Sequence, residues 1–311
     1  MNAHAQIEGT AGIRLLSEDP SSVPPASEAR ARLAALREIE VEYDDGIAWS
    51  WMRPVGRPAV TATMIAECAA WIGNLEVLGA TGEVRFGVLG SRFPGVFNLG
   101  GDLELFASLI RAGELERLVR YGLACVGWTS GLRRASERGI VTVALIQGSA
   151  MGGGFEAALY TDLIVAERQA KFALPESLFN LFPGMGAVSH LARRVGRRRA
   201  REMLLDGADF DAQTLHDEGV VDIVADEDGG MDAVREYARK YRRRHNALAS
   251  ICLALREAGP SDVELEAVVR LWAEAAMRIG ETDLRLMEKL VARQERLSNA
   301  GSAARDVRRS C

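Results

Sequence analysis

The first half of the chain shows two kinds of hydrophobic pattern. Residues 39–43 and 47–52 alternate apolar and polar positions on either side of an Asp-Asp-Gly turn at 44–46, a pattern that predicts a β-hairpin. In residues 58–78 the apolar side chains recur at spacings of three and four, which predicts an amphipathic helix. Both kinds of secondary structure are therefore expected before residue 80.

Strand and helix signals then alternate along the middle of the chain. Short apolar runs at 84–89, 141–147 and 163–166 predict strands, and residues 103–138 and 152–160 predict helices. Strands that alternate with helices are typical of an α/β core with crossover connections.

The chain divides into three predicted regions. Residues 1–30 are rich in Ser, Pro, Glu and small side chains and are expected to form a mobile N-terminal arm. Residues 31–230 are expected to form the α/β core. Residues 231–311 repeat apolar positions at helical spacing and predict a C-terminal helical subdomain.

Composition narrows the class of protein. A hydrophobic fraction of 48% with 26% charged residues excludes disorder over most of the 311 residues. The longest apolar runs, such as 141–146, are far shorter than the roughly 18 to 20 residues that cross a bilayer, and residues 1–10 lack the pattern of a secretory signal. A cytoplasmic protein that does not span a membrane is expected.

Charge and cysteine content exclude two further classes. The formal net charge of -5 argues against nonspecific binding to nucleic acid, which needs a basic surface. The four cysteines lack CxxC pairing, which argues against a disulfide framework and a zinc site. Neither a metal nor a cofactor is expected.

Glycines cluster at 100–101, at 152–154, and at 184 and 186, where bare backbone N–H groups could approach a ligand closely. These clusters do not form a phosphate loop, because no Gly-Lys-Ser/Thr follows them and no GxGxxG opens a helix after a strand. Residues 148–152 also lack the GxSxG order of a serine nucleophile elbow.

Two glutamates in apolar surroundings are the remaining candidates for chemistry. Glu156 lies in GGGFEAAL and Glu176 in FALPESLF. A poorly solvated carboxyl has a raised pKa, which suits it to general acid/base catalysis. Taken singly, a glutamate is more often a salt-bridged or surface residue than a catalytic one, and only the context of the motifs changes that.

Four motifs follow one another in order: FNLGGDL (97–103), GGGFE (152–156), AKFALPE (170–176) and FPGMG (182–186). Together they resemble the crotonase (enoyl-CoA hydratase/isomerase) superfamily over about residues 39–224. The resemblance implies a spiral of ββα units with a C-terminal helical region, assembled as a homotrimer or hexamer. It also implies that the N–H groups of Leu99 and Gly153 form an oxyanion hole and that Glu156 and Glu176 are the catalytic acid/base pair.

Within that superfamily the sequence is most similar to the diffusible-signal-factor synthases, through LPESLFNLFPGMGA, Phe155 and the segment ahead of the first strand. This resemblance implies dehydration of a medium-chain 3-hydroxyacyl group on acyl carrier protein to the cis-2-enoyl thioester, then hydrolysis to a free fatty-acid quorum-sensing signal. It also implies a sensor kinase as a further partner. The alternatives are an enoyl-CoA hydratase without thioesterase activity and a non-catalytic scaffold, and the presence of both glutamates argues against the scaffold.

A substrate-binding set follows from the same motifs. Gly100, Gly152, Met151, Phe155, Leu174 and Met185 are expected to contact the thioester or line a slot for its acyl tail, on which each buried methylene contributes about 0.8 kcal/mol. Ordinary core packing is the alternative for the apolar members. Arginines in 193–201 and basic residues in 240–244 could receive an acidic carrier protein or CoA phosphates, or could be solvated helix faces.

Overall fold

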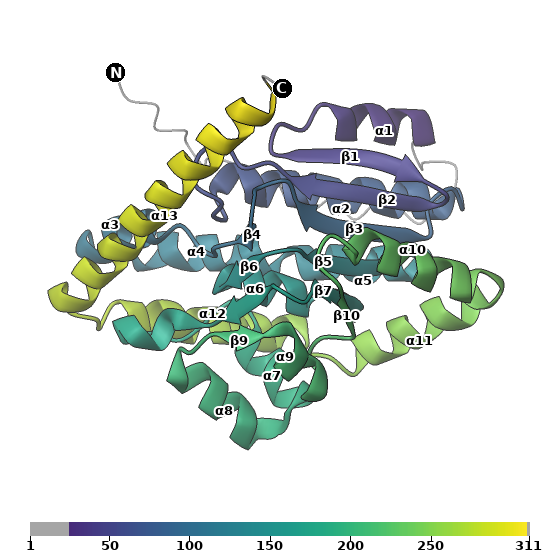
Figure 1. Ribbon diagram of the computed structural model, residues 1–311. Coiled ribbons are helices and arrows are strands. Elements are labelled where there is room, and N and C mark those ends of the chain that lie inside the picture. Colours follow the sequence, from purple (N-terminus) through teal and green to yellow (C-terminus); the bar gives the residue numbers. More distant parts are fainter. Residues whose placement is uncertain (1–24, 310–311) are drawn as a thin grey trace.

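A six-stranded sheet forms the centre of the computed structural model, which describes residues 25–309 (Figure 1). Its order is β1-β2-β3-β5-β7-β10, and β1 and β2 pair antiparallel as the predicted hairpin while the other neighbours pair parallel. The strands are β1 (Ile39–Asp44), β2 (Ile47–Met52), β3 (Phe86–Ser91), β5 (Val141–Ile146), β7 (Leu163–Glu167) and β10 (Ile223–Ala225). The predicted α/β class is confirmed, and most of the proposed arm, residues 1–24, lies outside the described residues.

Three helices replace the single helix predicted for residues 103–138. They are α3 (Leu103–Arg111), α4 (Leu115–Val126) and α5 (Trp128–Glu137). Gly113 has φ +69°, a left-handed conformation that ends α3, and Gly127 separates α4 from α5. The prediction was wrong because the apolar period continues across both breaks. The helix predicted at 58–78 is α2 (Ala62–Ala80), which begins at the N-cap Thr61.

A smaller sheet, which the sequence pattern did not predict, brings distant segments together. Its strands, in the order β4-β6-β8-β9, are β4 (Val96–Asn98), β6 (Ser149–Met151), β8 (Lys171–Ala173) and β9 (Phe210–Asp211). Two or three residues are too few to show a period of two. Because β4, β6 and β8 are parallel, their carboxyl ends lie at one edge, and the first three sequence motifs continue from that edge.

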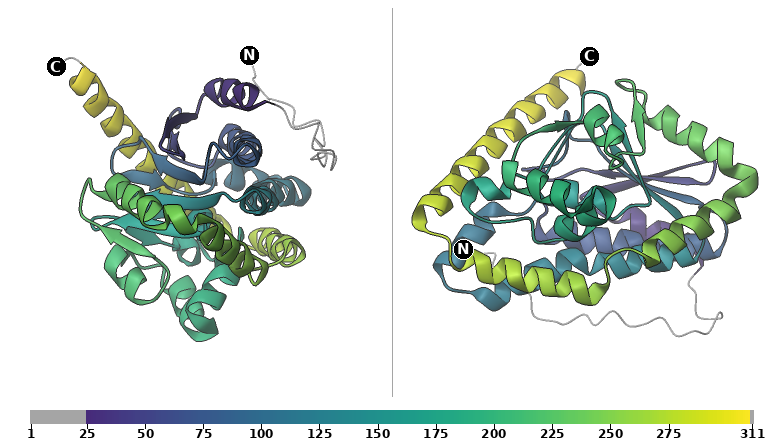
Figure 2. Two further views of the ribbon diagram at one scale, coloured as in Figure 1. Left: turned by 90° about the vertical axis from the view of Figure 1, so that its right-hand side faces the viewer. Right: turned by 90° about the horizontal axis from the view of Figure 1, so that it is seen from below.

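Helices make up most of the chain after residue 186. They are α7 (Ala187–Arg194), α8 (Gly196–Asp206), α9 (Ala212–Asp217), α10 (Gly230–Tyr241), α11 (His245–Glu257), α12 (Asp262–Ala276) and α13 (Glu281–Arg309). Helix α12 packs on α4, and α13 runs along one side of the molecule against α3 (Figure 2). Trp272 of α12 is buried with its ring 5.2 Å from that of Phe106, so the C-terminal helices share the core of the α/β region. No helix within residues 25–309 is long and apolar enough to cross a membrane.

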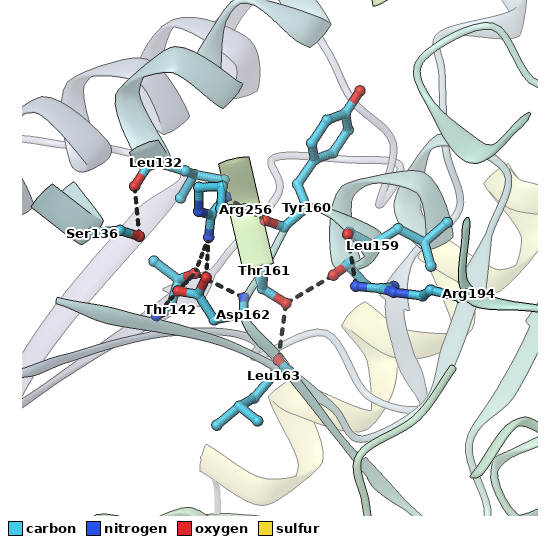
Figure 3. Close-up of polar contacts among 11 residues, drawn as sticks. Leu132, Ser136, Thr142, Leu159, Tyr160, Thr161, Asp162, Leu163, Arg194 and Arg256 are labelled. Atoms are coloured by element: carbon cyan, nitrogen blue, oxygen red, sulfur yellow. Dashed lines mark hydrogen bonds and ion pairs between the residues drawn. The ribbon is translucent and has the colours of Figure 1, made fainter. Parts of the chain in front are cut away.

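Two partly buried arginines hold the C-terminal end of the short helix α6 (Gly153–Leu159), which follows β6 (Figure 3). Arg194 donates to Leu159 O at 3.0 Å and Arg256 to Tyr160 O at 2.9 Å. Positive charge at this end complements the helix dipole. Arg256 also pairs with the buried carboxylate of Asp162 at 2.5 Å, which anchors it to the central sheet through Thr142.

Asp162→Asn is expected to destabilise the protein by about 3 kcal/mol, because it leaves the partly buried Arg256 charge without its partner. Urea unfolding measures the free energy. The matched control is Asp226→Asn, which breaks an exposed ion pair with Arg168 and should change stability by less than about 1 kcal/mol. If the two substitutions lower the free energy of unfolding by the same amount, burial of the Asp162–Arg256 pair does not add to its contribution.

Candidate active site

The edge where β4, β6 and β8 end gathers the residues that the motifs single out. The oxyanion loop, defined here as residues 99–101, follows β4, helix α6 with Glu156 follows β6, and the 3₁₀ helix η2 (Pro175–Phe179) with Glu176 follows β8. Segments far apart in the sequence are thereby brought to one place.

The assignment of Leu99 to the oxyanion hole is wrong. Its N–H donates to Pro58 O at 2.7 Å, and Val60 N donates to Gly100 O at 2.7 Å, so residues 58–60 and the oxyanion loop form a short parallel ribbon. A donor engaged in that ribbon is not available to a substrate oxygen.

The next donor along the loop, Gly101 N–H, has no acceptor among the described residues. Gly100 has φ +93°, and a Cβ there would lie 2.8 Å from Gly153 N, so only glycine allows the loop to approach α6 this closely. Gly101 N lies 3.3 Å from where a Cβ on Gly153 would be. Gly153 is the first residue of α6, and its N–H also has no acceptor in the described chain. Two free N–H groups therefore lie side by side.

Glu156 lies in the first turn of α6 and is 2% exposed. Its Oε1 accepts hydrogen bonds from Met185 N at 2.8 Å and Ala187 N at 3.0 Å, both in or just after the FPGMG segment. Burial raises the pKa of Glu156 to about 7, although the two N–H groups favour the charged form. The carboxyl is thus held in place near its point of half-ionisation at neutral pH.

Glu176 folds against the turn that precedes α6. A Cβ on Gly152, which has φ +50°, would lie 2.6 Å from Glu176 Oε1, so a glycine is needed there. Glu176 Oε2 is buried and has no hydrogen-bond partner within the described residues. Burial, and then the negative charge of Glu156, raise the pKa of Glu176 to about 8. The two carboxyls interact, and near neutral pH they hold about one proton between them.

An apolar cavity of about 50 Å³ begins at Gly101, Gly153 and Glu156. Its farther walls include residues of β2, α2, α4, α5 and the FPGMG segment. Among them are Met52, Met64, Ile65, Cys68, Tyr121, Cys125, Trp128 and Met185. A hydrophobic recess that starts at two free N–H groups and a carboxyl can accept the first carbons attached to a reacting carbonyl.

The predicted substrate-binding set is only partly at this cavity. Met185 lines the cavity, and Gly100 and Gly152 form the turns beside it. Met151 adjoins Gly100, because its carbonyl oxygen would lie 2.8 Å from a Cβ at that position. Phe155 and Leu174 do not line it: both lie in the core, where the Phe155 ring packs 5.1 Å from Phe172. Those two assignments were wrong because apolar residues beside a motif fill the interior of the helix–sheet packing.

Sequence reasoning missed the cavity walls supplied by α2 and α5. Met64, Ile65 and Cys68 fit the helical period of α2 as ordinary core positions do, and nothing local to Trp128 marks it as facing a cavity. Only the tertiary structure, which brings α2, α5 and α6 around one cavity, reveals their role.

The arginine-rich segment is partly used within the chain. Arg193 pairs with Glu264 at 2.7 Å, Arg199 pairs with Glu218 at 2.6 Å, and Arg194 is the partly buried cap of α6. Arg197 and Arg201 remain exposed. Binding of an acidic partner to this segment stays a prediction.

The two sheets, the helical C-terminal region and the site at the start of α6 define a crotonase-fold protein. The chain belongs to the enoyl-CoA hydratase/isomerase family, whose model matches residues 50–283.

Individual relatives agree with this assignment. The probable mitochondrial enoyl-CoA hydratase 2 of Arabidopsis thaliana is 31% identical over 188 residues, which are 60% of this chain and 56% of the relative. The 2,3-dehydroadipyl-CoA hydratase of Escherichia coli is 35% identical over 203 residues, covering 63% of this chain and 72% of the relative. Among solved structures, Pseudomonas aeruginosa DspI matches with a TM-score of 0.61 and 29% identity over 71% of this chain and 81% of that one.

Proposed function

We propose that the protein dehydrates a medium-chain 3-hydroxyacyl thioester to the 2-enoyl thioester at the site formed by Gly101, Gly153, Glu156 and Glu176. The observation that carries this proposal is the pair of interacting buried carboxyls beside two free N–H groups. Removal of water needs a base for the α proton and an acid for the departing hydroxyl, and carboxyls that share about one proton supply both.

The N–H groups of Gly101 and Gly153 bind the thioester oxygen, and the N-terminal dipole of α6 adds to the stabilisation of negative charge. The ionised glutamate, assigned as Glu156 because its carboxylate accepts from Met185 N and Ala187 N, removes the α proton and leaves an enolate. The electrons of the enolate then form the α–β double bond while protonated Glu176 donates its proton to the β hydroxyl, which leaves as water. Hydration follows the same steps in reverse.

The resemblance to the diffusible-signal-factor synthases favours acyl carrier protein as the carrier, a cis-2-enoyl product and a second step. In that step a carboxylate activates water, the water attacks the thioester carbonyl in the same oxyanion hole, and the thiol leaves to give the free acid. A homotrimeric or hexameric assembly, a sensor-kinase partner and a cytoplasmic location belong to the same proposal. The family match favours hydratase chemistry and keeps one alternative, an enoyl-CoA hydratase that releases no free acid.

Matched 3-hydroxyacyl and 2-enoyl thioesters, on carrier protein and on CoA, separate these functions. Mass spectrometry is expected to show dehydration followed by free cis-2-enoic acid from the carrier-bound substrate. Reversible hydration with the thioester intact would replace the synthase by the hydratase. Failure to convert any of these substrates would exclude both enzymes.

The pH dependence of kcat/KM is expected to be bell-shaped, with its maximum between about pH 7 and 8. At lower pH both carboxyls are protonated and the base is lost, and at higher pH both are ionised and the acid is lost. Initial rates with an enoyl thioester, measured from well below to well above this range, give the profile. A rate that stays constant from about pH 5 to about pH 10 would contradict the role of the pair.

A further inference from the structure

We propose that Tyr121 is the positioning residue that holds the Gly101 N–H in the oxyanion hole. The inference rests on the proposed function, because it concerns how that hole is kept in shape. Tyr121 lies on α4, outside all four sequence motifs, and its hydroxyl reaches the ribbon formed by residues 58–60 and the oxyanion loop.

The Tyr121 hydroxyl joins the two sides of this ribbon. It donates to Val60 O at 2.6 Å and accepts from Asp102 N at 3.3 Å. Earlier in the ribbon the backbone pairs directly, through Leu99 N to Pro58 O and Val60 N to Gly100 O. The hydroxyl therefore bridges the ribbon immediately after Gly101 and keeps the two backbones paired beyond it.

The direct and bridged contacts leave Gly101 between two fixed points. On the C-terminal side of Gly101, Asp102 N donates to the Tyr121 hydroxyl. On its N-terminal side, Gly100 O accepts from Val60 N. Asp102 also caps α3 through a bond from Leu105 N at 3.2 Å. A peptide restrained on both sides cannot turn its N–H away from Gly153 without breaking one of these bonds.

Packing fixes the tyrosine itself. Its ring meets Phe106 edge to face with centroids 4.9 Å apart, and a Cβ on Gly101 would touch the Phe106 ring at 2.7 Å. Tyr121 is buried, and burial raises its pKa well above the usual value, so the hydroxyl stays neutral and can donate and accept throughout the working pH range.

Tyr121→Phe tests the inference, because it retains the ring and leaves Val60 O and Asp102 N without the bridge. We expect kcat to fall about 10- to 100-fold, as when a reacting group is misplaced by about 1 Å, with KM changed less than about threefold. The carbonyl stretch of a bound 2-enoyl thioester, read by difference infrared spectroscopy, should move toward its value in free substrate. Tyr237→Phe, on α10 away from the site, is the control and should match the wild type in both readouts.

A second variant covers the case in which Tyr121→Phe does not fold. 4-Aminophenylalanine at position 121 can still donate to Val60 O but accepts poorly from Asp102 N–H, so we expect an intermediate kcat and carbonyl stretch. A wild-type carbonyl stretch and kcat in either folded variant would overturn the positioning role and leave the proposed function standing. A wild-type enzyme that neither turns over nor polarises any of the thioesters would overturn the proposed function, and this inference with it.

Discussion

Glu156→Gln and Glu176→Gln are each expected to lower kcat/KM at least about a hundredfold, the lower end of the range for loss of an acid/base group. Each amide retains the shape of the carboxyl, and the amide oxygen introduced by Glu156→Gln can still accept from Met185 N and Ala187 N. Neither amide can exchange a proton with substrate near neutral pH. Steady-state rates with 3-hydroxyacyl and 2-enoyl thioesters measure the loss in both directions.

Thermal unfolding of Glu176→Gln separates lost chemistry from lost structure. A carboxyl whose pKa is raised on folding costs stability as pH rises from its unfolded value of about 4.5 through its folded value of about 8. The glutamine carries no such cost, so the variant should be at least as stable as the wild type, with an advantage that grows up to about pH 8. Near-normal turnover in either variant removes that residue from the mechanism. A stability difference between Glu176→Gln and the wild type that does not change between about pH 4.5 and about pH 8 contradicts the raised pKa of the buried carboxyl.

Gly153→Pro is expected to lower kcat about 10²- to 10³-fold, the usual effect of losing one oxyanion-hole donor. Gly153 is the first residue of α6, where proline is well tolerated because the N–H has no helical partner. The substitution therefore removes the proposed donor from a position at which the helix does not need it. Rates are compared at saturating substrate, after circular dichroism has confirmed that the fold is retained.

Gly153→Ala is the matched control. It adds the same Cβ, which meets Gly101 N at 3.3 Å, but retains the N–H. We expect the alanine variant to lose much less activity than the proline variant. If the two lose the same amount, crowding against Gly101 explains the effect, and Gly153 N–H is not a donor to the substrate.

Much of the architecture could be predicted from local sequence. The hairpin of β1 and β2 follows from alternation around a turn, and β5 and β7 follow from short apolar runs. The candidate acid/base residues were also accessible, because Glu156 and Glu176 occur in apolar, glycine-rich segments whose order matches one family. These features depend on residues close together in the chain, so the sequence itself records them.

The two N–H groups proposed for the oxyanion hole could not be predicted from local sequence. Leu99 and Gly101 belong to one motif, and which N–H is free depends on Pro58, far earlier in the chain, which takes the N–H of Leu99. The cavity likewise takes walls from α2, α4 and α5, whereas Phe155, next to Glu156 in sequence, faces the core.

The sequence alone determined which residue types carry the chemistry, the α/β class and the hairpin, because composition and period are local properties. Tertiary structure alone decided which groups meet at the candidate site. The parallel register of β4, β6 and β8 brings three distant segments to one edge, and the pairing of the oxyanion loop with residues 58–60 leaves Gly101 N–H free. Burial, which raises the pKa values of Glu156 and Glu176, also exists only once the chain has folded around them.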